Sequence, residues 1–251
     1  MVYGLWQSAG GLLAQDYQQS ILANNLANVD TPGFKPDRIS FAERMNASAT
    51  GGGKSRHPVL DQLPGGVFET EVHTDFSAGS FVQSNNPLDL AIAGDGLLAV
   101  QTDEGVRYTR DGRFVMSADG SLLHATSGAK AIDGDGRAIF LNPASRDPVR
   151  VDPTGRITQG ESLAGQLKLV DFVDRSALQK EGKNLFVADR GASVDADGRI
   201  EQGMYEASAA DPVSLLVEMI AASRAYQLNA NMITMQDETI GRVVNETGRI
   251  G

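Results

Sequence analysis

The strongest structural signal in this chain lies in residues 211–245, which read DPVSLLVEMIAASRAYQLNANMITMQDETIGRVVN. Aspartate followed by proline favours a helix start, because Asp211 can cap the first turn and Pro212 suits its first position. We therefore predict a long helix that runs from there to about Asn245. Its apolar residues recur at helical spacing on two opposite sides. The first stripe contains Leu215, Met219, Ala222, Tyr226, Ile233, Ile240 and Val244, and the second contains Val213, Val217, Ala221, Leu228 and Met235.

A helix that is apolar on two sides must be buried on both of them. Residues from about Val2 to Asn28 contain no proline and predict a second long amphipathic helix, which ends at the sequence Asp30-Thr31-Pro32-Gly33. This helix can cover one side of residues 211–245, and contact with other subunits is the simplest cover for the other side. The apolar side of the second helix contains Leu5, Ala9, Leu12, Leu13, Ala23 and Ala27.

Between about Leu88 and Tyr205, short apolar or β-branched runs alternate with glycine-containing turn pairs. Such pairs supply the positive φ angles of tight hairpin turns, so this part predicts short antiparallel strands, most clearly at 88–92, 97–100 and 166–170. The pairs are Asp95-Gly96, Asp111-Gly112, Asp119-Gly120, Asp135-Gly136, Thr154-Gly155 and Asp197-Gly198.

The predicted fold class is α+β. Long N- and C-terminal helices form a coiled-coil-like helical domain, and a central all-β domain of short antiparallel strands lies between them in sequence. The expected divisions are an N-terminal helix at 1–36, a linker or extended segment at 37–75, the β domain at 76–210 and a C-terminal helix at 211–251. Within the linker, residues 46–66 have the composition of a flexible loop.

The composition excludes several classes of protein. The formal charge is 22 − 32 = −10, without the block of Lys and Arg that binds nucleic acid or an anionic membrane. The chain has no cysteine, which rules out disulfides and thiolate chemistry. Its first residues lack the features of a cleaved signal peptide, and no stretch approaches about 18 uncharged apolar residues. We expect a protein that is cytosolic or is exported without a cleaved signal.

No catalytic, metal or cofactor site is predicted. The three histidines, His57, His73 and His124, are far apart in sequence, whereas a zinc site needs three or four converging ligands. Residues 94–96, Gly-Asp-Gly, lack the helix and third glycine of a dinucleotide site. Most aspartates fall in turn sequences, which leaves no carboxylate pair for sugar hydrolysis. We therefore expect no enzyme activity, no small-molecule substrate and no nucleic-acid partner.

Three asparagines near the end of the first helix do not suit a hydrophobic core, since amides are poor helix formers. One explanation is fraying of the helix before Pro32. The other is that their side chains form hydrogen bonds across a helix interface and fix its register. The predicted assembly interface consists of Leu215, Met219, Ala222, Tyr226, Ile233, Ile240, Asn24, Asn25 and Asn28.

Four stretches have an order and spacing typical of one protein family. They are NNLANVDTPGFK at 24–35, NPLDLAIAGDG at 86–96 with YTRDGRF at 108–114, GKNLF at 182–186, and MIAASRAYQLN at 219–229. Together they resemble the axial proteins of the bacterial flagellum, the family of rod and hook proteins, across almost the whole chain. One departure occurs at 208–211, which read SAAD where the family usually has Ser-Asn-Val-Asn.

The resemblance implies a structural subunit of the flagellar basal-body rod that polymerises through its terminal helices and transmits torque. Within the family, the compact stretch 184–202 favours the FlgF type of the proximal rod over the FlgG type of the distal rod. Implied partners are other copies of the chain, neighbouring rod proteins and the flagellar export apparatus, in a rod that spans the periplasm. The alternative is an oligomeric extracellular binding module whose β domain recognises a glycan or a protein.

Overall fold

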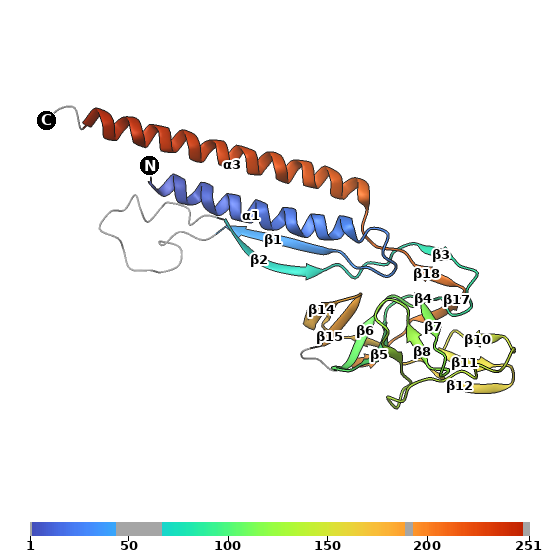
Figure 1. The fold of residues 1–251 in the computed structure, drawn as a ribbon. Helices are drawn as coiled ribbons and strands as arrows, with labels where there is room; N and C mark the ends of the chain where they lie inside the picture. Colours follow the sequence, from blue (N-terminus) through green and yellow to red (C-terminus); the bar gives the residue numbers. More distant parts are fainter. Residues whose placement is uncertain (1, 44–66, 189–192, 248–251) are drawn as a thin grey trace. The chain divides into compact units, whose positions relative to one another are not determined.

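The computed structural model describes residues 2–43, 67–188 and 193–247, which divide into two compact units (Figure 1). The helical unit consists of Met1–Ala27, Asp37–Asp75 and Asp211–Gly251. The β unit consists of Asn28–Pro36 and Phe76–Ala210. The flexible loop predicted at 46–66 lies outside the described residues.

Two long antiparallel helices dominate the helical unit (Figure 1). Helix α1 spans Val2–Ala27 and helix α3 spans Pro212–Thr247, close to the bounds predicted from the sequence. At the start of α3, Asp211 Oδ1 accepts a hydrogen bond from Val213 N at 3.2 Å. This cap satisfies one of the free amides of the first turn, as the Asp-Pro sequence predicts.

A β-ribbon packs beside α1 in the same unit. Strands β1 (Asp37–Glu43) and β2 (Val67–Thr74) pair antiparallel, and both contact α1. The sequence predicts only a linker or extended segment at 37–75, whereas the structure shows paired strands at both ends of it. A hairpin signal needs two strand patterns joined by a short turn, and here residues 44–66 separate them.

The described residues of the β unit form short strands and one 3-10 helix. In chain order the strands are β3 (Phe81–Gln83), β4 (Leu90–Ala93), β5 (Leu97–Thr102), β6 (Gly105–Thr109), β7 (Phe114–Met116), β8 (Leu122–His124), β9 (Lys130–Ala131), β10 (Val149–Val151), β11 (Arg156–Gln159), β12 (Ser162–Gln166), β13 (Leu169–Phe172), β14 (Leu178–Gly182), β15 (Leu185–Ala188), β16 (Ser193–Asp195), β17 (Arg199–Gln202) and β18 (Met204–Glu206). The 3-10 helix η1 (Arg175–Ala177) precedes β14.

The strands form small sheets in which the pairings are antiparallel, as predicted. The largest sheet has the order β14-β15-β6-β5-β9-β8-β7, and β13 pairs with both β5 and β16. Strands β10, β11 and β12 form a second sheet, β17 pairs with β4, and β18 pairs with β3. The predicted strand at 166–170 is wrong in its bounds, because β12 ends at Gln166 and β13 begins at Leu169.

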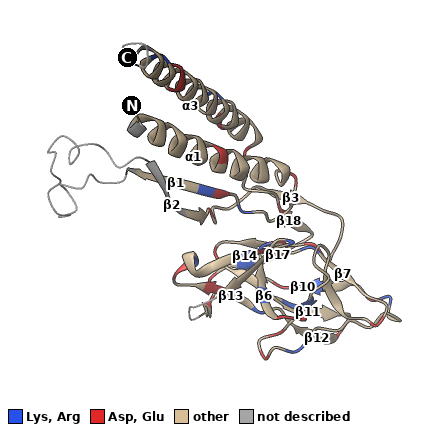
Figure 2. Cartoon of the chain, turned by 60° about the vertical axis from the view of Figure 1, so that its left-hand side comes forward, with Lys and Arg blue, Asp and Glu red and all other residues tan. Residues whose placement is uncertain are grey.

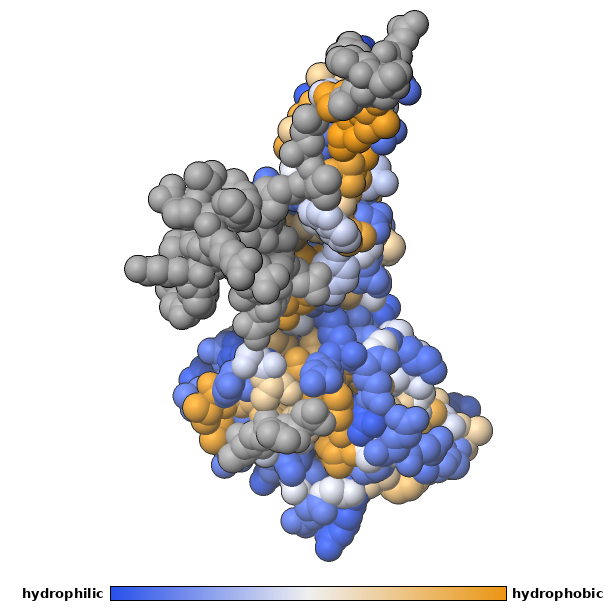
Figure 3. Space-filling model, turned by 90° about the vertical axis from the view of Figure 1, so that its left-hand side faces the viewer, coloured by the Kyte–Doolittle hydropathy of each residue, from blue (hydrophilic) through white to orange (hydrophobic). Residues whose placement is uncertain are grey.

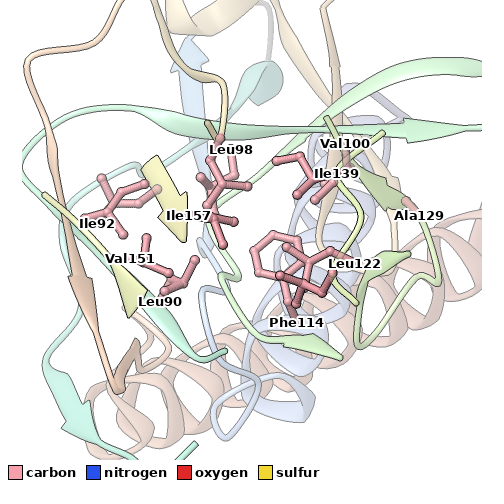
Figure 4. Packing of buried hydrophobic residues seen from close by; sticks show 14 of the residues in the cluster. Leu90, Ile92, Leu98, Val100, Phe114, Leu122, Ala129, Ile139, Val151 and Ile157 are labelled. Carbon is pink, nitrogen blue, oxygen red and sulfur yellow. The ribbon is translucent and has the colours of Figure 1, made fainter. Parts of the chain in front are cut away.

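The hydrophobic core of the β unit lies between these sheets. Figure 4 shows aliphatic side chains from β4, β5, β8, β10 and β11 gathered in one group, with the Phe114 ring at one side of it. Close packing of this kind excludes water and supplies most of the stabilisation of a small β domain. The labelled residues are Leu90, Ile92, Leu98, Val100, Phe114, Leu122, Ala129, Ile139, Val151 and Ile157.

The glycines of the six turn pairs serve two different purposes. Gly96, Gly120, Gly136 and Gly155 have positive φ angles, as hairpin turns require. For Gly112 and Gly198 the prediction of positive φ is wrong. A Cβ on Gly112 would lie 1.9 Å from the Leu90 carbonyl oxygen, so close approach of a neighbouring strand explains this glycine.

Candidate functional site

The inner face of the helical pair includes several small and polar residues. The amide of Gln236 lies against Gly4 and the amide of Asn229 lies against Gly11, so a Cβ at either glycine would lie 3.0 Å from that amide. Ser8, between the two glycines on the same side of α1, is buried. Gln236 buries a side-chain oxygen that has no hydrogen-bond partner among the described residues. The small residues let the helices approach closely at these points.

Helix α1 leaves half of its six predicted apolar residues exposed. Leu13 is 72% exposed, and Trp6 is 71% exposed. Ala23 and Ala27 are exposed as well, whereas Leu5 and Leu12 are half-buried. Helix α1 covers one side of α3, as the sequence predicts, and glycine and serine lie where the two helices approach most closely.

Helix α3 also presents an apolar outer face. The second stripe predicted from the sequence is exposed throughout, with Val213 at 68%, Leu228 at 65% and Met235 at 66%. Figure 3 shows hydrophobic surface along the helical unit. The large exposed apolar residues of α3 are Val213, Leu216, Val217, Ile220, Tyr226, Leu228, Met232, Met235, Val243 and Val244.

Charge is scarce on α1. Among the residues of Val2–Ala27, only Asp16 is charged, and Figure 2 shows the helix as an almost uninterrupted tan ribbon. Solvated helices of soluble proteins normally carry charged residues on the side that faces water. A helix with a single charged residue and with exposed Trp6 and Leu13 therefore has the character of a buried element.

The first stripe of α3, which the sequence assigns to the assembly interface, faces α1 within the chain. Leu215 and Ala222 are buried, and Met219, Ile233 and Ile240 are half-buried. Ile233 lies four residues after Asn229 and three before Gln236, so all three share one side of the helix. Tyr226 lies at the edge of this side and is 39% exposed.

The three asparagines lie in different surroundings. Asn25 is buried in the helical unit, where its Nδ2 donates to Asp37 O at 2.8 Å and its Oδ1 accepts from Asp37 N at 3.0 Å. Asn25 therefore attaches α1 to strand β1. Asn24 is exposed on α1. Asn28 belongs to the β unit, where its Oδ1 accepts from Thr31 Oγ1 at 3.3 Å.

Three charged residues meet inside the β unit, and we call them the junction triad: Lys35, Glu206 and Arg110. Lys35 Nζ lies 2.5 Å from Glu206 Oε1, and Arg110 Nε lies 2.5 Å from Glu206 Oε2. All three side chains are buried. Burial alone raises the pKa of Glu206, but the adjacent Arg110 and Lys35 charges outweigh it and hold that pKa below its usual value.

Arg110 connects the junction triad to the turn that follows β4. Its Nη1 donates to Gly96 O at 2.6 Å, and its Nη2 donates to Gly94 O at 2.7 Å and to Ile92 O at 2.8 Å. A guanidinium group has five donors in a fixed plane, and four of them are used here. The Gly94-Asp95-Gly96 turn therefore wraps around a buried arginine.

A second buried polar cluster surrounds Asp111. Arg113 donates to both carboxylate oxygens at 2.9 and 2.8 Å, and Thr126 Oγ1 donates to Oδ2 at 3.0 Å. Burial raises the pKa of Asp111, but Arg113 and His124 outweigh it and hold the pKa well below its usual range. His124 is fully buried, and its Nδ1 lies 2.7 Å from Ser127 Oγ. This histidine is part of the β unit's interior.

The described residues offer little support for catalysis. The β unit has an open hollow of about 840 Å³, and Asp195 is the one carboxylate among its described lining residues. Sugar hydrolysis usually needs two carboxylates at one cleft. No group of three metal-binding side chains occurs in the described ranges, and neither described helix is long and apolar enough to cross a bilayer.

The junction triad was not predicted from the sequence. Lys35 and Arg110 fall in two of the family-like stretches, but nothing in their local pattern indicates burial. Glu206 ends strand β18 and carries no motif. A lysine directly after Pro32-Gly33-Phe34 is the one weak signal, because a charged residue in an apolar turn needs a partner.

Three family models match this chain, and they follow its architecture. Residues 7–35 match the model described as flagella basal body rod protein, and residues 91–159 match the flagellar hook protein FlgE/F/G D1 domain. Residues 201–246 match the flagellar basal body rod FlgEFG protein C-terminal model. The first and last matches cover most of α1 and α3, and the middle match lies in the β unit.

Curated relatives align over nearly the whole chain. The flagellar basal-body rod protein FlgF of Caulobacter vibrioides is 35% identical over 92% of this chain and 91% of its own length. FlgG of Buchnera aphidicola subsp. Schizaphis graminum is 32% identical over 97% and 99%. FlgG of Caulobacter vibrioides is 28% identical over 93% and 95%. This chain belongs to the family of flagellar basal-body rod proteins.

Proposed function

We propose that this protein is a rod subunit that polymerises by burying the outer faces of α1 and α3 against neighbouring subunits. The observation that carries this proposal is the exposure of large apolar side chains on both helices, together with the single charge of α1. Burying a large apolar side chain contributes roughly 1.5–3 kcal/mol. A surface with many such side chains provides a strong driving force for association.

The contact between the two helices covers only part of their apolar surface. It buries Leu215 and Ala222, whereas the second stripe of α3 stays exposed outside the pair. In the proposed rod, helices of neighbouring subunits cover Trp6, Leu13 and the second stripe of α3. The helical unit then becomes part of a coiled-coil-like bundle. The predicted interface residues on the first stripe hold the two helices of one subunit in register within it.

The role we propose is mechanical and involves no catalysed reaction. Long helices packed by many small contacts resist bending and twisting, which suits a shaft that transmits torque. The proposed partners are other copies of the chain and neighbouring rod proteins in the basal body. The flagellar export apparatus would deliver the subunit to the growing rod.

Within the family we propose the FlgF type. Caulobacter vibrioides has both paralogues, and this chain is 35% identical to its FlgF but 28% identical to its FlgG. Because both relatives come from one organism, this comparison separates the two types better than a comparison of relatives from different bacteria. The FlgF type corresponds to the proximal part of the rod.

A pair of carboxylate substitutions on α3 tests the proposal. Leu228→Asp places a charge on the apolar outer face, where burial against a neighbour would leave that charge without a partner. Thr234→Asp places the same group on an exposed position about a third of a turn away. We expect Leu228→Asp to abolish swimming in a strain that lacks the native gene, and Thr234→Asp to restore it. Equal swimming of both variants would overturn the proposed interface.

A further inference from the structure

Four covalent connections join the two units. The chain passes from one unit to the other after Ala27, after Pro36, after Asp75 and after Ala210. The β-unit ends of these connections are therefore residues 28–36, the segment that starts at Phe76, and the segment that ends at Ala210. Any force that passes along the chain between helices and β unit must enter through these three segments.

The junction triad holds all three segments together inside the β unit. Lys35, from the first segment, donates through Nζ to Ser77 O at 2.7 Å and to Glu206 at 2.5 Å. Gly79 N, from the second segment, donates to Glu206 Oε1 at 2.8 Å. Glu206 lies only four residues before Ala210, where the third segment ends. One buried lysine and one buried glutamate thus bridge segments that are far apart in sequence.

Backbone hydrogen bonds also hold the three segments together near the junction triad. Gly33 N donates to Glu206 O at 2.7 Å, and Ala209 N donates to Phe34 O at 3.0 Å. A Cβ on Gly79 would lie 2.2 Å from the Ala207 carbonyl oxygen, so the second and third segments touch through their backbones. These hydrogen bonds and close approaches leave the three segments little freedom to move separately.

The hairpin β14–β15 supports the first segment from another side. Asn184 Nδ2 donates to Pro32 O at 2.8 Å, and Asn184 has a positive φ of 60°. Lys180 Nζ donates to Lys35 O at 2.5 Å and lies 4.5 Å from the centre of the Phe34 ring. The family-like stretches at 24–35 and 182–186, which the sequence leaves unconnected, therefore meet here.

We propose that the junction triad is a mechanical joint: it fixes the β-unit ends of the connections so that load on the helices reaches the β unit without local unfolding of the connecting segments. Ion pairs buried in protein are directional, and separating their partners leaves an uncompensated charge, so such a contact resists gradual deformation. Arg110 attaches the joint to the Gly94-Asp95-Gly96 turn and thereby to the β-unit interior. This inference rests on the proposed rod function for the origin of the load.

Lys35→Met is the sharpest variant for testing the joint. It keeps the length and the apolar stem of the side chain, and it leaves Glu206 paired with Arg110, so no carboxylate is left without a counter-ion. Lys130→Met is the matched control, because Lys130 is exposed on strand β9 of the same unit. Hydrogen exchange would be measured on the full chain of both variants.

In Lys35→Met we expect the amides of Gly33, Gly79 and Ala209 to exchange at least about tenfold faster than in the native chain. The amides of Ala99 and Leu122, which are bonded in the core at 3.0 Å, should keep their native rates. Lys130→Met should leave all five unchanged. If Lys35→Met kept native exchange rates at the first three amides, or accelerated exchange equally at all five, the proposal of a mechanical joint would be overturned.

Swimming in media of increasing viscosity then tests whether the joint carries mechanical load. Cells with Lys35→Met should assemble rods and swim in dilute medium but lose speed more steeply with viscosity than cells with Lys130→Met. Identical viscosity profiles would contradict the mechanical role even where exchange is faster. If the native chain itself failed to complement a rod mutant, the proposed rod function would be contradicted. The hydrogen-exchange result would still show whether the junction triad holds the three segments together.

Discussion

Lys35 and Glu206 are 171 positions apart in sequence, yet their charged groups meet at 2.5 Å with side chains that are 1% and 0% exposed. Lys35 lies shortly after the end of α1, and Glu206 lies shortly before the start of α3. The ion pair therefore joins the segment that follows α1 in sequence to the end of strand β18, both within the β unit. Because burial of both charges costs much of what their attraction gains, its main contribution is a defined geometry.

Acid should weaken the β unit through this pair. The pKa of Glu206 is lowered in the folded chain from its usual value of 4.5, so its ionised form stabilises the fold at pH values above 4.5. That contribution is lost as the pH falls through the lowered pKa. Asp111, whose pKa is also lowered, acts in the same direction.

Urea unfolding at a series of pH values measures this effect. The free energy of unfolding should stay level at neutral pH and fall as the pH drops below about 4.5. Glu206→Gln should lose about 3–5 kcal/mol at neutral pH, since Lys35 and Arg110 then lack a counter-ion, and should show a shallower acid slope. A control, Glu201→Gln on an exposed position of β17, should behave as the native chain. A native acid slope in Glu206→Gln would contradict this assignment.

Two glycine substitutions separate close packing from backbone strain. Gly112→Ala would place a Cβ 1.9 Å from Leu90 O, so β4 must shift, and we expect a loss of more than about 3 kcal/mol. Gly128→Ala meets nothing within 4 Å and has a φ of 75°, so it should cost only about 1 kcal/mol. Thermal unfolding of the two variants gives the comparison, and equal losses would contradict the packing explanation.

Assembly should change the environment of Trp6. This residue is the only tryptophan of the chain and is 71% exposed in the subunit. If the outer face of α1 is buried in the rod, its fluorescence should shift to shorter wavelength and become resistant to a soluble quencher. Dilute subunits before assembly give the emission of exposed Trp6. Rods of the Trp6→Phe variant give the background emission. Emission that stays at the solvent-exposed wavelength in rods would exclude α1 from the interface.

The two sides of α3 should respond differently in the isolated subunit. Ile233→Asp puts a carboxylate on the side that faces α1 and should destabilise the helical pair by about 1–3 kcal/mol. Leu228→Asp lies on the outer face and should change subunit stability by less than about 0.5 kcal/mol. Circular dichroism at 222 nm during thermal unfolding reports helix loss. Equal effects would mean that the two sides of α3 are not distinct.

The sequence predicted the major elements well because their signals are local. Asp211 and Pro212 mark the start of α3, and the turn glycines mark hairpins of the β unit. Pairings between distant segments were beyond reach, since no local pattern links β1 to β2 or Lys35 to Glu206. The small residues of α1 that lie closest to α3 were not foreseen. Hydrophobicity points to Leu13, whereas close helix approach depends on the small residues Gly4 and Gly11.

For the candidate site, periodicity identified the two apolar sides of α3 but could not say which one α1 covers. The structure places the Ile233 side against α1 and the Leu228 side in solvent. Which side of α3 packs against α1 depends on Gln236 and Asn229, because their amides lie against glycines of α1. The spacing of apolar residues does not identify polar residues that lie at a helix contact.

The most direct test of the account measures which side of α3 is covered in the rod. The chain has no cysteine, so single variants can be labelled with a maleimide without background. Leu228→Cys should react readily in dilute subunits and at least about tenfold more slowly in purified rods. Ala144→Cys, exposed in the β unit, reports the reagent's activity in both samples, and Ile233→Cys should react slowly in both. Labelling of Leu228→Cys at the same rate in subunits and rods would contradict assembly through the outer face.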